Sequence, residues 1–371
     1  MVNFIHVLNL IQLFLSYVLS NFIRKPIIWG TPAFVSIEPT NHCNLRCPEC
    51  PTGQSGLTRA TGNLRQEDFN LFIDQLSPHL AYLTLYFQGE PYLNKDLFRF
   101  ISYARSRRIY VWTSTNGHYF TKEYILKTID AGLNKLIVSL DGTDQQSYEQ
   151  YRIGGSFETV VTGIKDFVRI RKEMSARKPL LEIQFLVLKS NQHQINEIKK
   201  LGKLLGVNRM VLKKAQFYDF EQGNPLMPEE GQWSRYKRTS EQADKRTDGG
   251  FYHHDTMTPK HHGTTTSRQH DTTAPLHNDT THQLTNSQTH QFVIKNPLPN
   301  RCFRMWSGCV ITWDGKVVPC CFDKDADHCM GDLKTQSFKE IWEGEKYQRF
   351  RQAILKNRRS IEICSNCSQT L

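Results

Sequence analysis

The sequence predicts an α/β fold: a partial (β/α)6 barrel of the TIM type, followed by a small cysteine-rich region of β-hairpin and helix. Between about residues 32 and 216, short β-branched or aromatic runs alternate six times with amphipathic helical patterns. Such an order favours a parallel sheet that curls into a barrel. Seven of the ten cysteines lie after residue 292. The hydrophobic share of 39% in 371 residues suffices for a sizeable core.

The predicted strands and helices follow one another in a regular order. The strands are expected at residues 33–38, 81–87, 109–114, 135–140, 181–188 and 209–215. The helices between them are expected at residues 66–76, 95–105, 122–131, 157–171 and 194–205. In barrels of this kind the chemistry collects at the carboxyl ends of the strands. The loops that follow the strands are therefore the candidate functional segments.

The loop after the first predicted strand carries three cysteines, Cys43, Cys47 and Cys50. One short loop can present three thiolates to a four-iron cluster, which leaves one iron open to bind a substrate or cofactor. A structural zinc site and a thiol redox site are the alternatives, since the last two cysteines have CxxC spacing. The redox site leaves Cys43 without a role.

Polar residues also follow the next three strands, at residues 86–91, 113–117 and 139–142. With the CxxxCxxC loop, this pattern resembles the radical S-adenosylmethionine (SAM) enzymes over about residues 33–216. The resemblance implies a 4Fe-4S cluster held by Cys43, Cys47 and Cys50, with SAM bound to the open iron. It implies reductive cleavage of SAM to a 5′-deoxyadenosyl radical that abstracts hydrogen from a substrate. The catalytic residues that act on the substrate stay unknown.

The same resemblance implies a set of SAM contacts. Residues 88–91 are similar to the family's Gly-Gly-Glu-Pro motif, with Gln88 in place of the first glycine. Glu90 is then expected to accept a hydrogen bond from the methionine amino group of SAM. The cofactor-binding residues implied in this way are Gly89, Glu90, Asn116, Ser139, Asp141 and Arg152. Glu49 replaces the aromatic residue that the family usually has before the third cysteine.

Residues 1–31 are expected to form an N-terminal segment with an amphipathic helix. Residues 1–23 are largely apolar and are followed by Arg24 and Lys25. A secretory signal is disfavoured, because neither a basic start nor a small-residue cleavage site is present. One polar stripe recurs at helical spacing and consists of Asn3, His6, Asn9 and Gln12. It favours a helix that packs on the protein, with a membrane surface or a membrane span as the alternatives.

The composition changes after residue 228, where the barrel region 32–228 is expected to end. Residues 229–291 are rich in Thr, His, Asp, Gln and Ser and hold eight of the fourteen histidines. Such a segment buries too little apolar surface to offset its ordering entropy, so a disordered polar insert is predicted. The histidines are spaced irregularly, which argues against a dedicated metal site.

Residues 292–371 are expected to form a second metal-binding region. Two alternating runs around Asp314 predict a hairpin over residues 310–321, and a helix is predicted over about residues 337–356. The region resembles the SPASM domain, or its shorter twitch form, which implies a second 4Fe-4S cluster. The implied ligands are Cys302, Cys320, Cys364 and Cys367, with Cys309 as a substitute and Cys321 and Cys329 as spare thiols. A four-cysteine zinc ribbon is the alternative.

These features together predict a cytoplasmic iron-sulfur enzyme. The resemblance favours a peptide or protein substrate, with a small carbohydrate or aminocyclitol as an alternative. A reduced flavodoxin or ferredoxin is the expected electron donor. The net charge of +11 suits an anionic partner. Nucleic acid is not expected, because no stripe of basic and aromatic residues is present; a non-catalytic zinc or nucleic-acid-binding protein is the alternative from another class. Contact of the N-terminal helix with the inner face of the membrane stays open.

Overall fold

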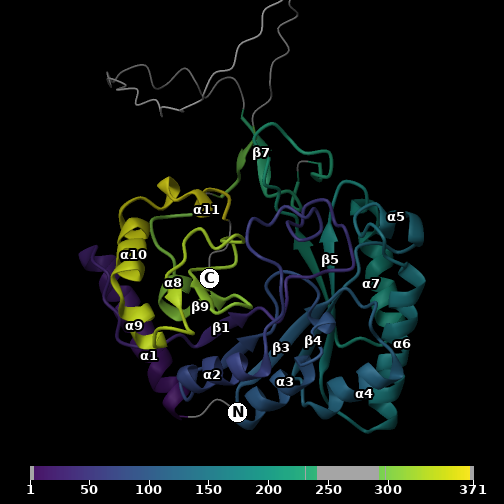
Figure 1. The fold of residues 1–371 in the computed structure, drawn as a ribbon. Helices are drawn as coiled ribbons and strands as arrows, with labels where there is room; N and C mark the ends of the chain where they lie inside the picture. The colour runs from purple at the N-terminus through teal and green to yellow at the C-terminus, as the bar shows by residue number, and fades with distance from the viewer. Residues whose placement is uncertain (1–3, 230, 240–291, 297, 368–371) are drawn as a thin grey trace, which may run out of the picture.

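A single nine-stranded sheet organises the chain (Figure 1). The computed structural model describes residues 4–229, 231–239, 292–296 and 298–367. The order of strands in the sheet is β11-β10-β9-β1-β2-β3-β4-β5-β6. The six barrel strands are β1 (Phe34–Ile37), β2 (Tyr82–Thr84), β3 (Tyr110–Thr115), β4 (Lys135–Ser139), β5 (Leu180–Val187) and β6 (Arg209–Lys214). Adjacent members of this set are parallel, which confirms the predicted parallel α/β fold.

Helices cover the outer face of the barrel sheet (Figure 1). They are α2 (Gln66–Leu76), α3 (Leu97–Ser106), α4 (Lys122–Asp130), α5 (Gln145–Glu149), α6 (Phe157–Glu173) and α7 (Ile195–Leu204), with short 3-10 turns at Pro91–Leu93 and Gln192–Gln194. The strand residues that face these helices, such as Val35, Leu83 and Val111, are fully or almost fully buried in the main core. Alternation along the strands leaves the opposite face for the interior of the barrel.

The cysteine-rich C-terminal region continues the barrel sheet. Its strands are β9 (Gly308–Ile311), β10 (Lys316–Val318) and β11 (Gly331–Asp332). β9 pairs parallel with β1, and β10 pairs antiparallel with β9, as the predicted hairpin requires. The sequence did not show the pairing of β9 with β1, because a hairpin pattern says nothing about which outer edge it joins. This pairing fixes the position of the second cysteine cluster relative to the first loop.

The predicted C-terminal helix is two helices, α9 (Phe338–Glu343) and α10 (Glu345–Asn357). The chain breaks at Gly344, whose backbone is extended with ψ near 163°. Glycine is a poor helix former, and the apolar pattern on both sides had concealed the break. Two further short helices, α8 (Arg304–Ser307) and α11 (Glu362–Ser365), carry or follow the cysteines, and a 3-10 turn spans Arg358–Ser360.

The first helix, α1 (Phe4–Ile23), packs against this C-terminal part of the chain (Figure 1). Of the predicted polar stripe, His6 and Asn9 are buried against the protein, whereas Gln12 is exposed. Asn3 lies outside the described residues. The helix therefore rests on the domain, as the sequence favoured, but through only part of the predicted stripe.

A two-stranded ribbon of β7 (Tyr236–Arg238) and β8 (Phe292–Ile294) closes the described fold near the end of the barrel. Most of the predicted disordered insert, residues 240–291, lies outside the described residues. The two strands that flank this segment pair antiparallel, with Arg238 opposite Phe292. The described residues on either side of this segment therefore lie side by side.

Candidate functional site

The loop with the first three cysteines leaves the carboxyl end of β1, as the sequence predicted. Cys47 is 5% exposed, and Cys43 and Cys50 pack partly buried against the same small core cluster. The loop is turned by local hydrogen bonds: the Cys50 amide donates to the Cys47 carbonyl over 3.1 Å, and the Leu45 amide donates to Cys43 Sγ over 3.5 Å. The three thiols are therefore presented by one short, ordered turn.

Burial makes two thiols of this loop, Cys43 and Cys47, reluctant to ionise. It raises the pKa of Cys43 to about 11, and it also raises the pKa of Cys47, although the nearby Arg152 opposes the shift. A thiol must lose its proton to bind iron. The surroundings of Cys43 and Cys47 thus favour neutral thiols until a cation compensates their charge.

Glu90 is fastened directly behind the cysteine loop. Its amide donates to the His42 carbonyl over 2.7 Å. Gly89 has a φ of +73°, and a Cβ there would come within 2.6 Å of the Thr40 and His42 carbonyl oxygens. Only glycine permits this close approach of the two loops. The motif at residues 88–91 and the cysteine loop are therefore one packed unit.

The carboxylate of Glu90 is buried in a set of donors. It accepts hydrogen bonds from the Asn116 amide over 2.7 Å, the Thr115 hydroxyl over 2.8 Å and the Tyr92 amide over 3.1 Å. Desolvation nevertheless dominates and raises the pKa of Glu90 to about 7. A further cationic donor, such as an ammonium group, would stabilise the ionised form of this buried carboxylate.

Arg152 links the fourth strand to the cysteine loop. Its Nε and Nη2 bond to Asp141 Oδ2 at 2.6 and 2.5 Å, and its Nη1 donates to Cys47 Sγ over 3.7 Å. Asp141 Oδ1 accepts from the Leu186 amide over 2.6 Å. The guanidinium is thus aimed at a thiol of the predicted cluster, and a buried carboxylate holds it there.

The remaining predicted SAM contacts lie around the same strand ends. The Asn116 side-chain amide donates to Asn44 Oδ1 over 2.7 Å, beside Cys43. Ser139 is partly buried at the end of β4, opposite Gln184 of β5. Glu49 accepts a hydrogen bond from Asn224 over 2.9 Å. The structure therefore brings Gly89, Glu90, Asn116, Asp141 and Arg152 to the cysteine loop, and leaves Ser139 at the neighbouring strand end.

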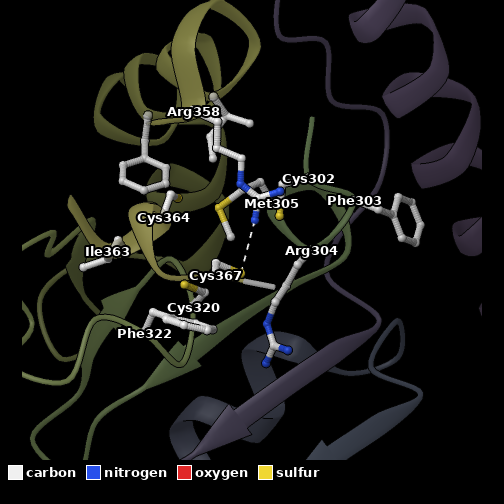
Figure 2. A pocket seen from close by; sticks show the side chains of 12 residues that line it. Cys302, Phe303, Arg304, Met305, Cys320, Phe322, Arg358, Ile363, Cys364 and Cys367 are labelled. Carbon is white, nitrogen blue, oxygen red and sulfur yellow. Dashed lines mark hydrogen bonds between the residues drawn. The ribbon is translucent and has the colours of Figure 1, made fainter. Parts of the chain in front are cut away.

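The second cysteine group lines one cavity (Figure 2). Cys302 precedes α8, Cys320 follows β10, and Cys364 and Cys367 belong to or follow α11. Three segments that are distant in sequence thus deliver the four thiols predicted as ligands. The three other C-terminal cysteines, Cys309, Cys321 and Cys329, do not line it among the residues described.

Two arginines lie near these thiols. Arg358 Nη2 donates to Cys367 Sγ over 3.4 Å, and Arg304 lines the same cavity (Figure 2). The Nε atoms of both arginines are buried and lack a hydrogen-bond partner among the described residues. An unsatisfied buried donor is costly. Thiolates and the sulfides of a cluster would supply the missing acceptors and negative charge, so the donor set fits an iron-sulfur centre.

Within the described part of the chain, no three His, Cys, Asp or Glu side chains are grouped closely enough to hold one metal ion.

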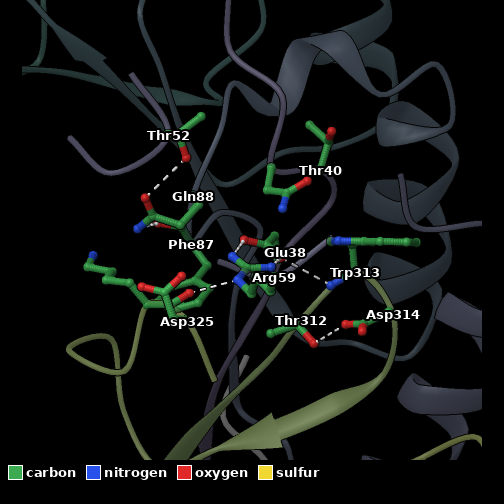
Figure 3. Close-up of polar contacts among 12 residues, drawn as sticks. Glu38, Thr40, Thr52, Arg59, Phe87, Gln88, Thr312, Trp313, Asp314 and Asp325 are labelled. Atoms are coloured by element: carbon green, nitrogen blue, oxygen red, sulfur yellow. Dashed lines mark hydrogen bonds and ion pairs between the residues drawn. The ribbon is translucent and has the colours of Figure 1, made fainter. Parts of the chain in front are cut away.

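A buried ion pair that the sequence analysis missed ties the two cysteine regions together (Figure 3). Arg59 is paired with Glu38 at the end of β1, and the Trp313 amide also donates to Glu38, over 3.2 Å. Arg59 Nε donates to the Lys324 carbonyl over 2.7 Å. Glu38 closes a predicted strand, but no local pattern identifies a partner 21 residues away.

Comparison with known proteins identifies two regions of the chain. The family model of the radical SAM superfamily matches residues 37–177. The family model of the SPASM domain, an iron-sulfur cluster-binding domain, matches residues 302–368. The matches contain the first and second cysteine groups, respectively. They confirm the resemblance seen in the sequence and favour iron-sulfur over zinc in the second group.

Curated relatives include enzymes with different activities. An AdoMet-dependent heme synthase from Methanosarcina barkeri is 30% identical over 178 residues, 48% of this chain and 49% of the relative. A PqqA peptide cyclase from Bradyrhizobium diazoefficiens is 25% identical over 228 residues, 60% of this chain and 57% of the relative. The matched segments thus span about half the length of these curated relatives.

Solved structures share the fold. Streptococcus suis SuiB bound to precursor peptide SuiA has a TM-score of 0.57 at 12% identity, covering 87% of this chain and 67% of SuiB. Native anSMEcpe with bound AdoMet and Cp18Cys peptide has a TM-score of 0.52 at 13% identity, covering 91% of this chain and 86% of anSMEcpe. At these identities the likeness establishes the fold alone.

Proposed function

Because residues 37–177 form a radical SAM domain and residues 302–368 an iron-sulfur SPASM domain, we propose that this enzyme modifies a peptide or protein by hydrogen abstraction. One observation supports this most: three thiols on one loop at the end of β1, with Glu90 and Arg152 fastened to that loop. A site with three thiols is suited to a four-iron cluster with one open iron.

We assign the first cluster to Cys43, Cys47 and Cys50, and one auxiliary cluster to Cys302, Cys320, Cys364 and Cys367. The first cluster, with SAM bound, supplies a 5′-deoxyadenosyl radical. Thiols that line a single cavity with Arg304 and Arg358 support the second assignment. The remaining cysteines, Cys309, Cys321 and Cys329, are then free thiols.

The side chains around the first loop bind and orient SAM in this proposal. Glu90 accepts a hydrogen bond from the methionine amino group of SAM. The Thr115 hydroxyl and the Asn116 backbone amide hold the Glu90 carboxylate in place. Arg152, oriented by Asp141, places positive charge beside the cysteine loop. Gly89 allows the loop of Glu90 to approach closely enough for these contacts. Asn116, Ser139 and Asp141 supply polar groups near the ribose and the methionyl carboxylate of SAM.

The assignment of a peptide substrate rests on one relative and on the shape of the surface. The match to the PqqA peptide cyclase extends over 60% of the chain. Two open cavities of about 440 and 340 Å³ adjoin the second cysteine group and share Phe220, Glu221 and Ser365 in their linings. One has a basic lining that includes Lys237 and Lys295. An extended peptide fits adjoining open clefts better than a small carbohydrate or aminocyclitol, which needs a more enclosing site.

The ten cysteines, seven of which we assign to clusters, support a reducing compartment, which we take to be the cytoplasm. A reduced flavodoxin or ferredoxin is the proposed electron donor. Both assignments follow from the chemistry of the clusters, which must be reduced and kept from oxygen.

Anaerobic reconstitution tests the SAM chemistry. The protein should gain a brown iron-sulfur chromophore and release 5′-deoxyadenosine when SAM and dithionite are added. Replacing Cys43, Cys47 or Cys50 by Ala should abolish this release and lower the iron content. Cys329→Ala is the matched control and should change neither. Release of 5′-deoxyadenosine by the Cys43→Ala variant at the wild-type rate would contradict the assignment.

A second experiment tests the auxiliary cluster and the peptide substrate separately from the SAM chemistry. Candidate peptides encoded beside the gene are incubated anaerobically with the enzyme, SAM and dithionite, and mass spectrometry detects a change of mass. Cys302→Ala and Cys364→Ala should spare uncoupled SAM cleavage but stop product formation. Turnover of an aminocyclitol, with every peptide unchanged, would contradict the peptide assignment while leaving the SAM chemistry intact.

A further inference from the structure

The first helix presents its polar residues to the protein and its apolar residues to solvent. The residues of α1 that are buried are His6, Asn9, Leu13, Ser16 and Ser20. Four of these five are polar, which reverses the usual arrangement of a surface helix. Such a reversal leaves most of the apolar face without a partner in the described fold, while at one edge Phe14 meets Phe303 edge to face.

The buried polar residues of α1 are bonded to the segment that follows the helix. Asn9 and Thr31 exchange two hydrogen bonds, of 2.7 and 3.0 Å. The Ser20 hydroxyl accepts from the Ile27 amide over 2.8 Å. A Cβ at Gly30 would come within 2.7 Å of Asn9 Oδ1, so the chain approaches the helix closely there. These contacts fix which face of α1 points outward.

The outward face is broad and apolar. Its large exposed residues are Phe4, Ile5, Val7, Leu8, Ile11, Phe14, Leu15, Val18, Phe22 and Ile23. Phe14 is 55% exposed and Phe22 is 86% exposed. Contiguous exposed apolar surface of this kind marks an interaction site in soluble proteins. At 1.5 Å per residue, the helix extends over about 30 Å.

Exposed basic residues gather at the carboxyl end of α1. Arg24 and Lys25 follow the helix directly, and Arg24 Nη1 donates to the Leu355 carbonyl over 3.4 Å. This contact brings the exposed Lys356 and Arg359 to the same end of α1. Arg301 is also exposed and near enough to Tyr17 to influence its ionisation. The chain as a whole carries a net charge of +11.

We propose that α1 lies flat on an anionic lipid surface, with its outward face in the outer part of the acyl region. The basic residues at its carboxyl end would then contact the headgroups. A spanning helix is less suitable, although α1 is the one helix of the described chain that is long and apolar enough by composition. To span a bilayer, α1 would have to break the hydrogen bonds that Asn9 makes with Thr31 and that Ser20 makes with Ile27.

The breadth of the face favours lipid over a second copy of the chain. Neighbours such as Val7 and Leu8, or Phe14 and Leu15, point about 100° apart on a helix and are all exposed. A partner helix covers a narrow seam of about two positions in seven. Lipid covers the whole arc. The basic end also complements anionic headgroups, whereas a copy of this chain brings the same positive charge.

Vesicle sedimentation of the full-length protein tests the proposal. The expected result is binding to phosphatidylcholine vesicles that contain 30% phosphatidylglycerol, and much weaker binding to pure phosphatidylcholine. Phe14→Glu and Val18→Glu should each lower partitioning roughly 10-fold or more, because each removes buried apolar area and adds like charge. Leu204→Glu changes a leucine on α7 that is even more exposed, at 82%, and should have no effect.

A charge reversal tests the basic end. Lys25→Glu combined with Lys356→Glu should lower binding to the anionic vesicles roughly 10-fold or more, and 0.5 M NaCl should do the same for the wild type. Iron content and circular dichroism should match the wild type, since none of these residues lines a cysteine site. Protein that remains in the supernatant with both vesicle types overturns the proposal. A dimer in solution that Phe14→Glu dissociates, without any vesicle binding, also overturns it in favour of self-association.

Discussion

Arg59 and Glu38 form a two-pronged ion pair, with Nη1–Oε2 at 2.6 Å and Nη2–Oε1 at 2.5 Å, in which Glu38 is fully buried (Figure 3). Glu38 directly follows β1, where the cysteine loop begins, and Arg59 follows that loop. Both also contact the C-terminal region, through Trp313 and Lys324. The pair therefore joins the segment of the first cluster to the region of the second.

Arg59→Met should destabilise the protein by about 3–5 kcal/mol, because it leaves Glu38 charged and buried without its partner. Desolvation already raises the pKa of Glu38, so the loss should shrink at low pH, where Glu38 accepts a proton. Urea unfolding at pH 7 and at pH 5 measures both effects. Arg107→Met removes the exposed pair with Asp74 and is the control, for which little change is expected. An equal effect of the two variants would contradict the role assigned to Arg59.

SAM binding should weaken as the pH falls through about 7. Burial raises the pKa of Glu90 to about 7, so below that pH the free protein holds a neutral Glu90. An ammonium group binds the carboxylate, and the proton must leave first. Glu90→Gln should weaken SAM binding by about 1.5–3 kcal/mol at pH 8. It should also flatten the pH profile between 6 and 8, measured by calorimetry under anaerobic conditions. A variant that keeps the wild-type pH profile would place the titrating group elsewhere.

The two clusters should respond separately to two arginines. Arg152 donates to Cys47 and Arg358 donates to Cys367. A nearby positive charge stabilises the reduced, more negative form of a cluster. Arg152→Gln should therefore shift the reduction potential of the first cluster to more negative values, and Arg358→Gln should do so for the second. A redox titration followed by electron paramagnetic resonance measures both. Each variant is the control for the other, and equal shifts of both clusters would count against the assigned ligands.

Deletion of residues 240–288 should leave solubility and SAM cleavage almost unchanged. The flanking strands pair at Arg238 and Phe292, and residues 239 and 289–291 then remain as a short hairpin loop. The composition of the deleted segment offers little apolar surface to the core. Size-exclusion chromatography and the release of 5′-deoxyadenosine check the outcome. Aggregation of the shortened protein would show that the segment contributes to the fold.

Some of the fold and the site could be predicted because the signals are local. The helix at Gln66–Leu76 follows the predicted bounds, and the strands that begin at Lys135 and Arg209 do so at their first residue. Hydrophobic periodicity determines such elements with little help from distant residues. The spacing of Cys43, Cys47 and Cys50 on one loop is local in the same sense. Glu90 and Arg152 could be identified only through a family resemblance, since an isolated Glu or Arg carries no such signal.

The sequence by itself determined the alternating barrel, the first cysteine loop and the apolar helix at the start of the chain. Tertiary structure decided that β9 joins β1, that Arg59 pairs with Glu38, and that α1 turns its polar residues inward. The physical reason is the distance along the sequence over which each interaction acts. Periodicity and spacing act within a few residues, whereas an edge pairing, a buried ion pair or the exposed side of a helix depends on which distant segments meet.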